Sequence, residues 1–176
     1  MVTYVKGDIF NSSAQVLTNA VNCVGVMGKG VALEFKKRYP SMFEDYKKRC
    51  ELNQIKPGHL YLWENDKVQI LNFPTKRHWQ DQSLLSDIED GLKFLANNYI
   101  DLGIDSLAMP AIGCGLGGLD WNQVKPLIDK YLGYIPDLEV YVYESLITAS
   151  LNNDDFSKSN LSLPESDKSV AKPADL

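Results

Sequence analysis

The sequence is poor in the residues that build metal centres and disulfide frameworks, with three cysteines and two histidines among 176 residues. Cys23, Cys50 and Cys114 are odd in number and widely spaced, which matches neither a disulfide framework nor the spacing of zinc ligands. This usage favours a reducing, cytoplasmic location. No histidine-bearing partner motif accompanies any of the three, so a catalytic cysteine is disfavoured. We expect no metal and no cofactor.

Long apolar runs are also missing. No run approaches the ~20 residues that span a bilayer, and the opening stretch "MVTYVKGDIF" reads as a strand rather than as a signal peptide. We therefore expect no membrane attachment. Hydrophobic residues make up 44% of the chain, which is ordinary for one globular domain with its own core. A monomer is the expected state.

The net charge of −5 argues against a general nucleic-acid coat, but the charge is uneven. Residues 1–80 contain 12 Lys and Arg against 7 Asp and Glu, whereas residues 81–176 contain 6 against 16. A locally basic face on an acidic protein therefore remains open, and so does a DNA or RNA substrate. The alternative is that segments such as "FKKRYP" are only solvated helix faces.

Strand and helix patterns are mixed along the chain. We expect strands over 2–8, 14–22, 59–65, 67–73, 105–110 and 138–145, and helices over 30–39, 41–50, 84–103 and 121–133. Ser41 and Ser83 are predicted to cap the second and third helices. This order predicts an α/β fold of three layers, with the sheet between helices. The polar composition near the C-terminus predicts a folded domain over 1–148 and a flexible tail or linker over 149–176.

Two glycine clusters each lie between a predicted strand and a predicted helix: "MGKG" at 27–30 and "GCGLGG" at 113–118. Glycine lets the backbone approach a ligand closely, and successive N–H groups beside a helix N-terminus form a nest for phosphate oxygens. Two such nests on neighbouring strands would hold a diphosphate from both sides. Neither cluster matches a P-loop or a first-strand dinucleotide fingerprint, which disfavours a Rossmann-type oxidoreductase. Glycine turns without a ligand are the alternative.

Four motifs bring a family into view: "GDI" after the first strand, "NAVNCVGVMGKGVALEFK", "NFPTKRHW" and "PAIGCGLGGLDW", in this order. Together, over about residues 1–145, they resemble a macrodomain, the ADP-ribose-binding fold with a mixed central sheet. Within that family they resemble the DarG type, antitoxins that remove ADP-ribose from DNA and oppose a DarT-type toxin. The resemblance implies a DNA ADP-ribosyl glycohydrolase acting on single-stranded DNA. Thymidine is the expected modified base, and guanosine stays open as the alternative.

The resemblance also implies a set of binding residues. Asp8 and Ile9 would contact the adenine, and Asn22 would lie near the distal ribose. The diphosphate and that ribose would contact two loops and a threonine: Met27, Gly28, Lys29, Gly30, Thr75, Gly113, Cys114, Gly115, Leu116, Gly117 and Gly118. From the residues alone, Asp8 could equally be a turn or cap residue, and Asn22 could be a turn former at a strand end.

Lys76 is the catalytic candidate. In the related glycohydrolases a lysine at this Thr-Lys position reacts at the anomeric carbon of the distal ribose. A lysine can be an amine nucleophile where burial and neighbouring cations favour its neutral form, and Arg77 is such a neighbour. Arg77, His78 and Trp79 are also candidate DNA contacts, to a phosphate or to an unpaired base. The alternatives are a solvated surface lysine and a packed tryptophan.

One departure from the wider family affects the mechanism. The protein-directed relatives carry an acid directly after "GCGL", where this chain has Gly117, while Asp120 is placed to cap the following helix. The general acid is therefore open between His78 and a water molecule. Two other functions on the same fold stay open: an ADP-ribose-1″-phosphate phosphatase and a non-catalytic ADP-ribose reader.

Overall fold

The computed structural model describes residues 1–144. The expected tail at 149–176, and the last residues of the expected domain, lie outside the described residues, so this boundary stays a prediction. The described chain forms six strands, four α-helices and one short 3₁₀ helix, in the order β1 (Val2–Val5), η1 (Ile9–Asn11), β2 (Val16–Asn22), α1 (Gly30–Arg38), α2 (Pro40–Glu51), β3 (Tyr61–Glu64), β4 (Gln69–Lys76), α3 (Leu85–Asn98), β5 (Ser106–Pro110), α4 (Trp121–Leu132) and β6 (Glu139–Tyr143).

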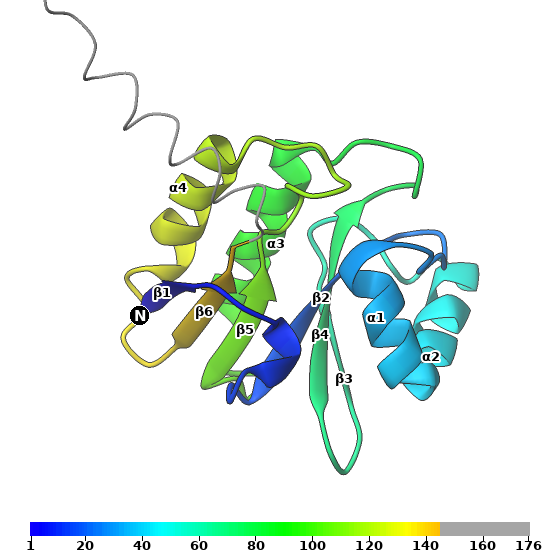
Figure 1. Ribbon diagram of the computed structural model, residues 1–176, viewed down its shortest axis with the longest axis horizontal. Helices are drawn as coiled ribbons and strands as arrows, with labels where there is room; N and C mark the ends of the chain where they lie inside the picture. Colours follow the sequence, from blue (N-terminus) through cyan, green and yellow to red (C-terminus); the bar gives the residue numbers. More distant parts are fainter. Residues whose placement is uncertain (145–176) are drawn as a thin grey trace, which may run out of the picture.

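The strands form one mixed sheet in the order β1-β6-β5-β2-β4-β3. All neighbouring strands are parallel except β3, which is antiparallel to β4 at one edge. Helices α1 and α2 cover one face of the sheet and α3 and α4 cover the other (Figure 1). The predicted three-layer α/β/α sandwich with a mixed central sheet is confirmed.

Each face of the sheet has its own apolar core. Phe35 of α1 and Tyr46 of α2 are fully buried on one face, and Leu92 of α3 and Trp121 of α4 are fully buried on the other. The central strands β2 and β4 are buried along almost their whole length on both faces of the sheet. Their buried residues include five polar ones: Thr18, Asn19, Asn22, Asn72 and Thr75. The carboxyl ends of these strands are therefore held rigidly from both sides.

Two of the predicted helix caps are wrong. Helix α2 begins at Pro40, whose fixed φ suits the first helical position, so Ser41 lies inside the helix. Helix α3 begins at Leu85, and its N-cap is Leu84. The hydroxyl of Ser83 is instead buried without a hydrogen-bond partner among the described residues. The backbone N–H of Ser83 donates to the carbonyl of Gly117 at 2.9 Å, a contact with the second glycine cluster.

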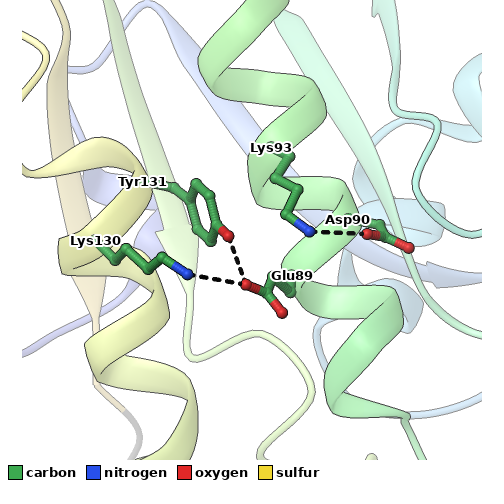
Figure 2. Close-up of polar contacts among 5 residues, drawn as sticks. All are labelled: Glu89, Asp90, Lys93, Lys130 and Tyr131. Carbon is green, nitrogen blue, oxygen red and sulfur yellow. Dashed lines mark hydrogen bonds and ion pairs between the residues drawn. The ribbon is translucent and has the colours of Figure 1, made fainter.

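Helices α3 and α4 are joined by polar contacts at their surface (Figure 2). The carboxylate of Glu89 accepts hydrogen bonds from the hydroxyl of Tyr131 and from the ammonium group of Lys130, the latter at 3.2 Å. Asp120 caps α4 as predicted, because its carboxylate accepts from the N–H of Asn122 at 2.9 Å. These contacts fix α3 and α4 relative to each other. The loops that precede the two helices follow β4 and β5, so both begin at the carboxyl edge of the sheet.

Candidate functional site

A cleft of about 810 Å³ opens at the carboxyl ends of β2, β4 and β5. This is where ligands bind in open α/β sheets, and the volume is in the range of small-molecule sites. Many of the predicted site residues line it: Asn22, Gly28, Lys29, Gly30, Thr75, Lys76, Trp79, Gly113, Gly115, Leu116 and Gly117. The other predicted residues are not among its lining: Asp8, Ile9, Met27, Arg77, His78, Cys114 and Gly118.

The first glycine loop presents the N-terminus of α1 to the cleft. The helix begins at Gly30, and its N-cap Lys29 makes no side-chain cap hydrogen bond, so the N–H groups of the first turn remain available to an anion. Gly30 has φ +61°, a conformation that disfavours other residues. Met27 is fully buried beneath the loop and packs in the core, which anchors the loop rather than exposing a side chain to a ligand.

The second glycine loop faces the first one. A Cβ placed on Gly30 would lie 3.3 Å from the Cδ1 of Leu116, so the two loops approach to van der Waals contact. Among the described residues, the N–H groups of 115, 116 and 117 form no backbone hydrogen bond, whereas those of Cys114 and Gly118 bond within the loop. Successive unpaired N–H groups opposite a helix N-terminus provide the donors that a diphosphate requires.

Asn22 builds the segment that leads into the first loop. Its Oδ1 accepts from the N–H groups of Val24 and Val26 at 3.0 and 3.4 Å, and its Nδ2 donates to the carbonyl of Val26 at 2.6 Å. The hydroxyl of Tyr46 also donates to Asn22. The turn-forming role that the sequence left open is therefore present, and the side chain lines the cleft as well.

Lys76 is the last residue of β4, which extends three residues beyond the end of the strand predicted over 67–73. The strand continues through Pro74 because its antiparallel neighbour β3 pairs only as far as Asn72, so the missing N–H of Pro74 leaves no bond unmade on that side. Next to this point the register with β2 shifts, and Lys76 rather than Thr75 pairs with Asn22. Bulges of this kind re-aim side chains beside active sites. Here the register shift between β2 and β4 places Lys76 at the cleft.

The residues after Lys76 form a compact turn at the mouth of the cleft. The Nζ of Lys76 donates to the carbonyl of Trp79 at 3.4 Å. The indole of Trp79 is 49% exposed, so it is not a core residue, and its ring centre lies 5.6 Å from that of His78. Arg77 forms two hydrogen bonds to Asp87, which raise the pKa of the guanidinium above its usual value. The positive charge of Arg77 is therefore already paired with the carboxylate of Asp87.

The predicted adenine residues lie outside the cleft lining. Asp8 is exposed and its carboxylate accepts from the N–H of Phe10 at 3.0 Å, so it caps η1, while Ile9 is buried in the core. Tyr143, which the sequence did not single out, lines the cleft at the end of β6 and is paired with Pro110 of β5. No local sequence pattern identifies Tyr143, because its position at the cleft depends on the pairing of β6 with β5.

The cysteines near the cleft are protonated thiols at neutral pH. Burial, and to a smaller extent the charge of Asp120, raises the pKa of Cys114 to about 12. Burial also raises the pKa of Cys23 to about 11. A nucleophilic cysteine is a thiolate, so this environment disfavours either residue in that role.

Within residues 1–144, His, Cys, Asp and Glu side chains nowhere gather in groups of three or more that could hold a metal ion. The helices of this part of the chain are too short or too polar to cross a membrane.

Residues 18–128 match the family model of the Macro domain. The chain therefore belongs to the macrodomain family, as its four motifs predicted. A Mycobacterium tuberculosis protein named DNA ADP-ribosyl glycohydrolase is 41% identical over 147 residues, which are 81% of this chain and 42% of that protein. A solved structure of the macrodomain of Mycobacterium tuberculosis DarG matches with a TM-score of 0.78 and 41% identity, over 81% of this chain and 97% of the solved one.

Proteins of a second species, Thermosipho africanus, are similar to this chain to the same degree. A Thermosipho africanus protein, named as a fusion of a DNA ADP-ribosyl transferase and a DNA ADP-ribosyl glycohydrolase, is 39% identical over 161 residues, or 81% of this chain and 41% of that protein. The structure of Thermosipho africanus DarTG in complex with ADP-ribose has a TM-score of 0.79 and 39% identity, over 83% of this chain and 42% of that one. This chain spans about two fifths of the length of these curated relatives.

Proposed function

We propose that this protein is an ADP-ribose-binding hydrolase that removes ADP-ribose from a base of single-stranded DNA, with thymidine as the modified base. One observation carries the proposal: Lys76 lies in the same cleft as both glycine loops. The loops supply donors for a diphosphate, and the lysine supplies a nucleophile at a fixed position beside it. The names of the DarG relatives, and the ADP-ribose in one of their structures, support the same function.

In the proposed reaction, the diphosphate lies between the loops at 27–30 and 113–118, and the distal ribose lies beside Asn22 and Lys76. The amine nitrogen of Lys76 attacks the anomeric carbon as the bond to the base nitrogen breaks. The bonding electrons leave with the base, which takes a proton from water or from His78. Water then attacks the anomeric carbon, the bond to the Lys76 nitrogen breaks, and its electrons return to the amine. The proton that this water loses replaces the one that the base took from water or from His78. Thr75 and the backbone of the second loop orient the sugar.

The other two functions on this fold use the site less fully. A non-catalytic reader needs no amine beside the distal ribose, yet Lys76 lines the cleft. A phosphatase acting on ADP-ribose-1″-phosphate needs no surface for a nucleobase, yet the exposed indole of Trp79 stands at the mouth. Exposed aromatic rings beside cations are typical of single-strand binding. We therefore propose that His78 and Trp79, in the segment after Lys76, face the DNA.

The cellular setting follows from the same proposal. An enzyme that restores modified DNA would act in the cytoplasm, as a monomer, against a DarT-type toxin. The fusion of a transferase to a glycohydrolase in Thermosipho africanus supports the pairing with such a toxin. ADP-ribose is then a substrate group rather than a cofactor.

The proposal is tested with a single-stranded oligonucleotide that carries ADP-ribose on one thymidine. Wild-type protein is expected to release ADP-ribose, and Lys76→Ala is expected to release none while still binding ADP-ribose. Lys93→Ala, on the surface of α3, is the matched control and keeps full turnover. Release by Lys76→Ala at the wild-type rate would overturn the mechanism. No release by the wild type would overturn the function, and ADP-ribose-1″-phosphate would be the next substrate.

A further inference from the structure

Arg77 and Asp87 form a two-point ion pair beside the cleft. The Nε of Arg77 lies 3.0 Å from Oδ2 of Asp87, and its Nη2 lies 3.1 Å from Oδ1. The side chain of Asp87 is 6% exposed, while that of Arg77 is 62% exposed. Among the ion pairs of residues 1–144, no other joins both carboxylate oxygens to one guanidinium. Such paired geometry fixes the orientation of both groups.

Asp87 is held in place by the start of α3. It lies in the first turn of the helix, and its N–H donates to the carbonyl of Leu84 at 3.1 Å. A carboxylate in the first turn is stabilised by the free N–H groups and the dipole of the helix. Because a buried carboxylate without a partner is costly, Asp87 in turn requires the guanidinium of Arg77. The pair therefore joins the end of β4 to the start of α3.

The segment between them, residues 77–83, is tied to the protein at both ends. At its start, the carbonyl of Arg77 accepts from the N–H of Cys23 at 3.3 Å, next to Asn22. At its end, the N–H of Ser83 donates to the carbonyl of Gly117 at 2.9 Å. The segment thus connects the exit of β2 with the second glycine loop. Lys76 directly precedes it and bonds to it through the carbonyl of Trp79.

We propose that Arg77 and Asp87 are positioning residues for Lys76, an inference that rests on the proposed function. The ion pair sets the direction of the 77–83 segment, and the segment holds the amine of Lys76 in the cleft opposite Asn22. The guanidinium of Arg77 then serves the protein rather than a DNA phosphate, although the residue is exposed and adjacent to the catalytic candidate. His78 and Trp79 remain the DNA-facing residues of this segment.

Three variants separate the two roles of Arg77: Arg77→Ala, Asp87→Asn and the double variant. Misplacing a catalytic group by about 1 Å costs on the order of 10²-fold in rate. Each single variant is therefore expected to lower kcat on the modified oligonucleotide by roughly 10- to 100-fold, with KM and the Kd for ADP-ribose unchanged. The double variant is expected to be no slower than the slower single one, because both remove the same contact. Arg49→Ala, which breaks the arginine–aspartate pair on α2, is the matched control with unchanged kcat.

A contrary result has a definite form. If Arg77→Ala raises KM, with a weaker salt dependence of binding, and Asp87→Asn leaves kcat and KM at wild-type values, Arg77 contacts DNA and the proposal is wrong. A second result would also overturn the proposal: a lower melting temperature in both variants, with oligonucleotide turnover and ADP-ribose binding reduced by the same factor. That result would mean that the pair has only a structural role.

A second readout keeps this test independent of the DNA reaction. The ring-opened aldehyde of ADP-ribose condenses with the amine of Lys76, water leaves, and cyanoborohydride delivers hydride to the imine, which leaves a stable secondary amine that mass spectrometry locates. At saturating ADP-ribose, both single variants are expected to slow this labelling by the same factor, and Arg49→Ala is expected to leave it unchanged. Labelling at the wild-type rate in both variants would overturn the positioning role. Wild-type labelling without DNA turnover would overturn the proposed function alone.

Discussion

Asn22 and Lys76 are partners at the last paired position of β2 and β4, directly after a register shift between the two strands. The shift leaves Thr75 without a register partner in β2. Two motifs that are far apart in the sequence therefore meet at one point of the cleft. Asn22 shapes the loop that leads to the first glycine cluster, and Lys76 supplies the amine. The site is thus assembled by strand pairing rather than by either motif alone.

Asn22→Ala is expected to weaken both the fold and the binding of ADP-ribose. The substitution leaves the N–H groups of Val24 and Val26 without their acceptor, and the loss of one such hydrogen bond costs about 0.5–1.5 kcal/mol. Urea unfolding should show that loss, and isothermal calorimetry should show a larger Kd for ADP-ribose. Asn22→Asp keeps the acceptor and is expected to lose less stability. Two variants as stable as the wild type would show that the side chain does not organise the loop.

Much of this site could be predicted from sequence because it depends on local chemistry. Glycines between a strand and a helix allow a phosphate nest, and residues of both clusters line the cleft, although Met27, Cys114 and Gly118 do not. The end of β4 could not be predicted in this way, since Pro74 ordinarily terminates a strand pattern. It is tolerated here only because β3 is short, which is a property of the neighbouring strand.

The contacts that fix the segment 77–83 could not be predicted either. The pairing of Arg77 with Asp87 depends on where α3 begins, and Ser83, which has the pattern of a cap, is instead held against Gly117 by the fold. Tyr143 reaches the cleft only because β6 lies beside β5. Each is a long-range consequence of the sheet order.

Gly117→Ala is expected to destabilise the second loop. A Cβ at this position would overlap the hydroxyl of Ser83 and the carbonyl of Gly113, and overpacking of this kind typically costs about 1–3 kcal/mol. Gly115→Ala is the matched control, because a Cβ there meets no atom within 4 Å. The difference between their urea midpoints measures the effect. Equal midpoints would mean that the 77–83 segment moves aside freely. The same contacts disfavour an acidic side chain at 117.

Trp79→Ala is expected to affect the DNA part of the substrate and not the ADP-ribose. Stacking of a base on an aromatic side chain contributes about 1–3 kcal/mol, so KM for the oligonucleotide should rise by roughly 5- to 150-fold. The Kd for free ADP-ribose should stay at its wild-type value, and Trp79→Phe should retain most of the affinity for the oligonucleotide. Ile100→Ala, which removes another exposed apolar side chain, is the control. An unchanged KM in Trp79→Ala would exclude a role in DNA binding.

Glu89→Gln is expected to make the stability of the protein less dependent on acid. The hydrogen bond from Tyr131, and next the one from Lys130, lowers the pKa of the Glu89 carboxyl in the folded protein (Figure 2). Since the folded pKa lies below the unfolded value of about 4.3, this carboxylate contributes stability that is fully present above that pH. The contribution is lost as pH falls through the folded pKa.

Melting temperatures measured between pH 7 and pH 3 test this reasoning. The range begins well above the unfolded pKa of the carboxyl and extends into the acidic region where its contribution to stability is lost. The wild type should lose more stability than Glu89→Gln across the acidic part of the range, while Asp90→Asn, which breaks the neighbouring pair with Lys93, should follow the wild type. Parallel curves for the wild type and Glu89→Gln would mean that the contact with Tyr131 does not persist in solution. In that case the joint between α3 and α4 would depend on apolar packing alone.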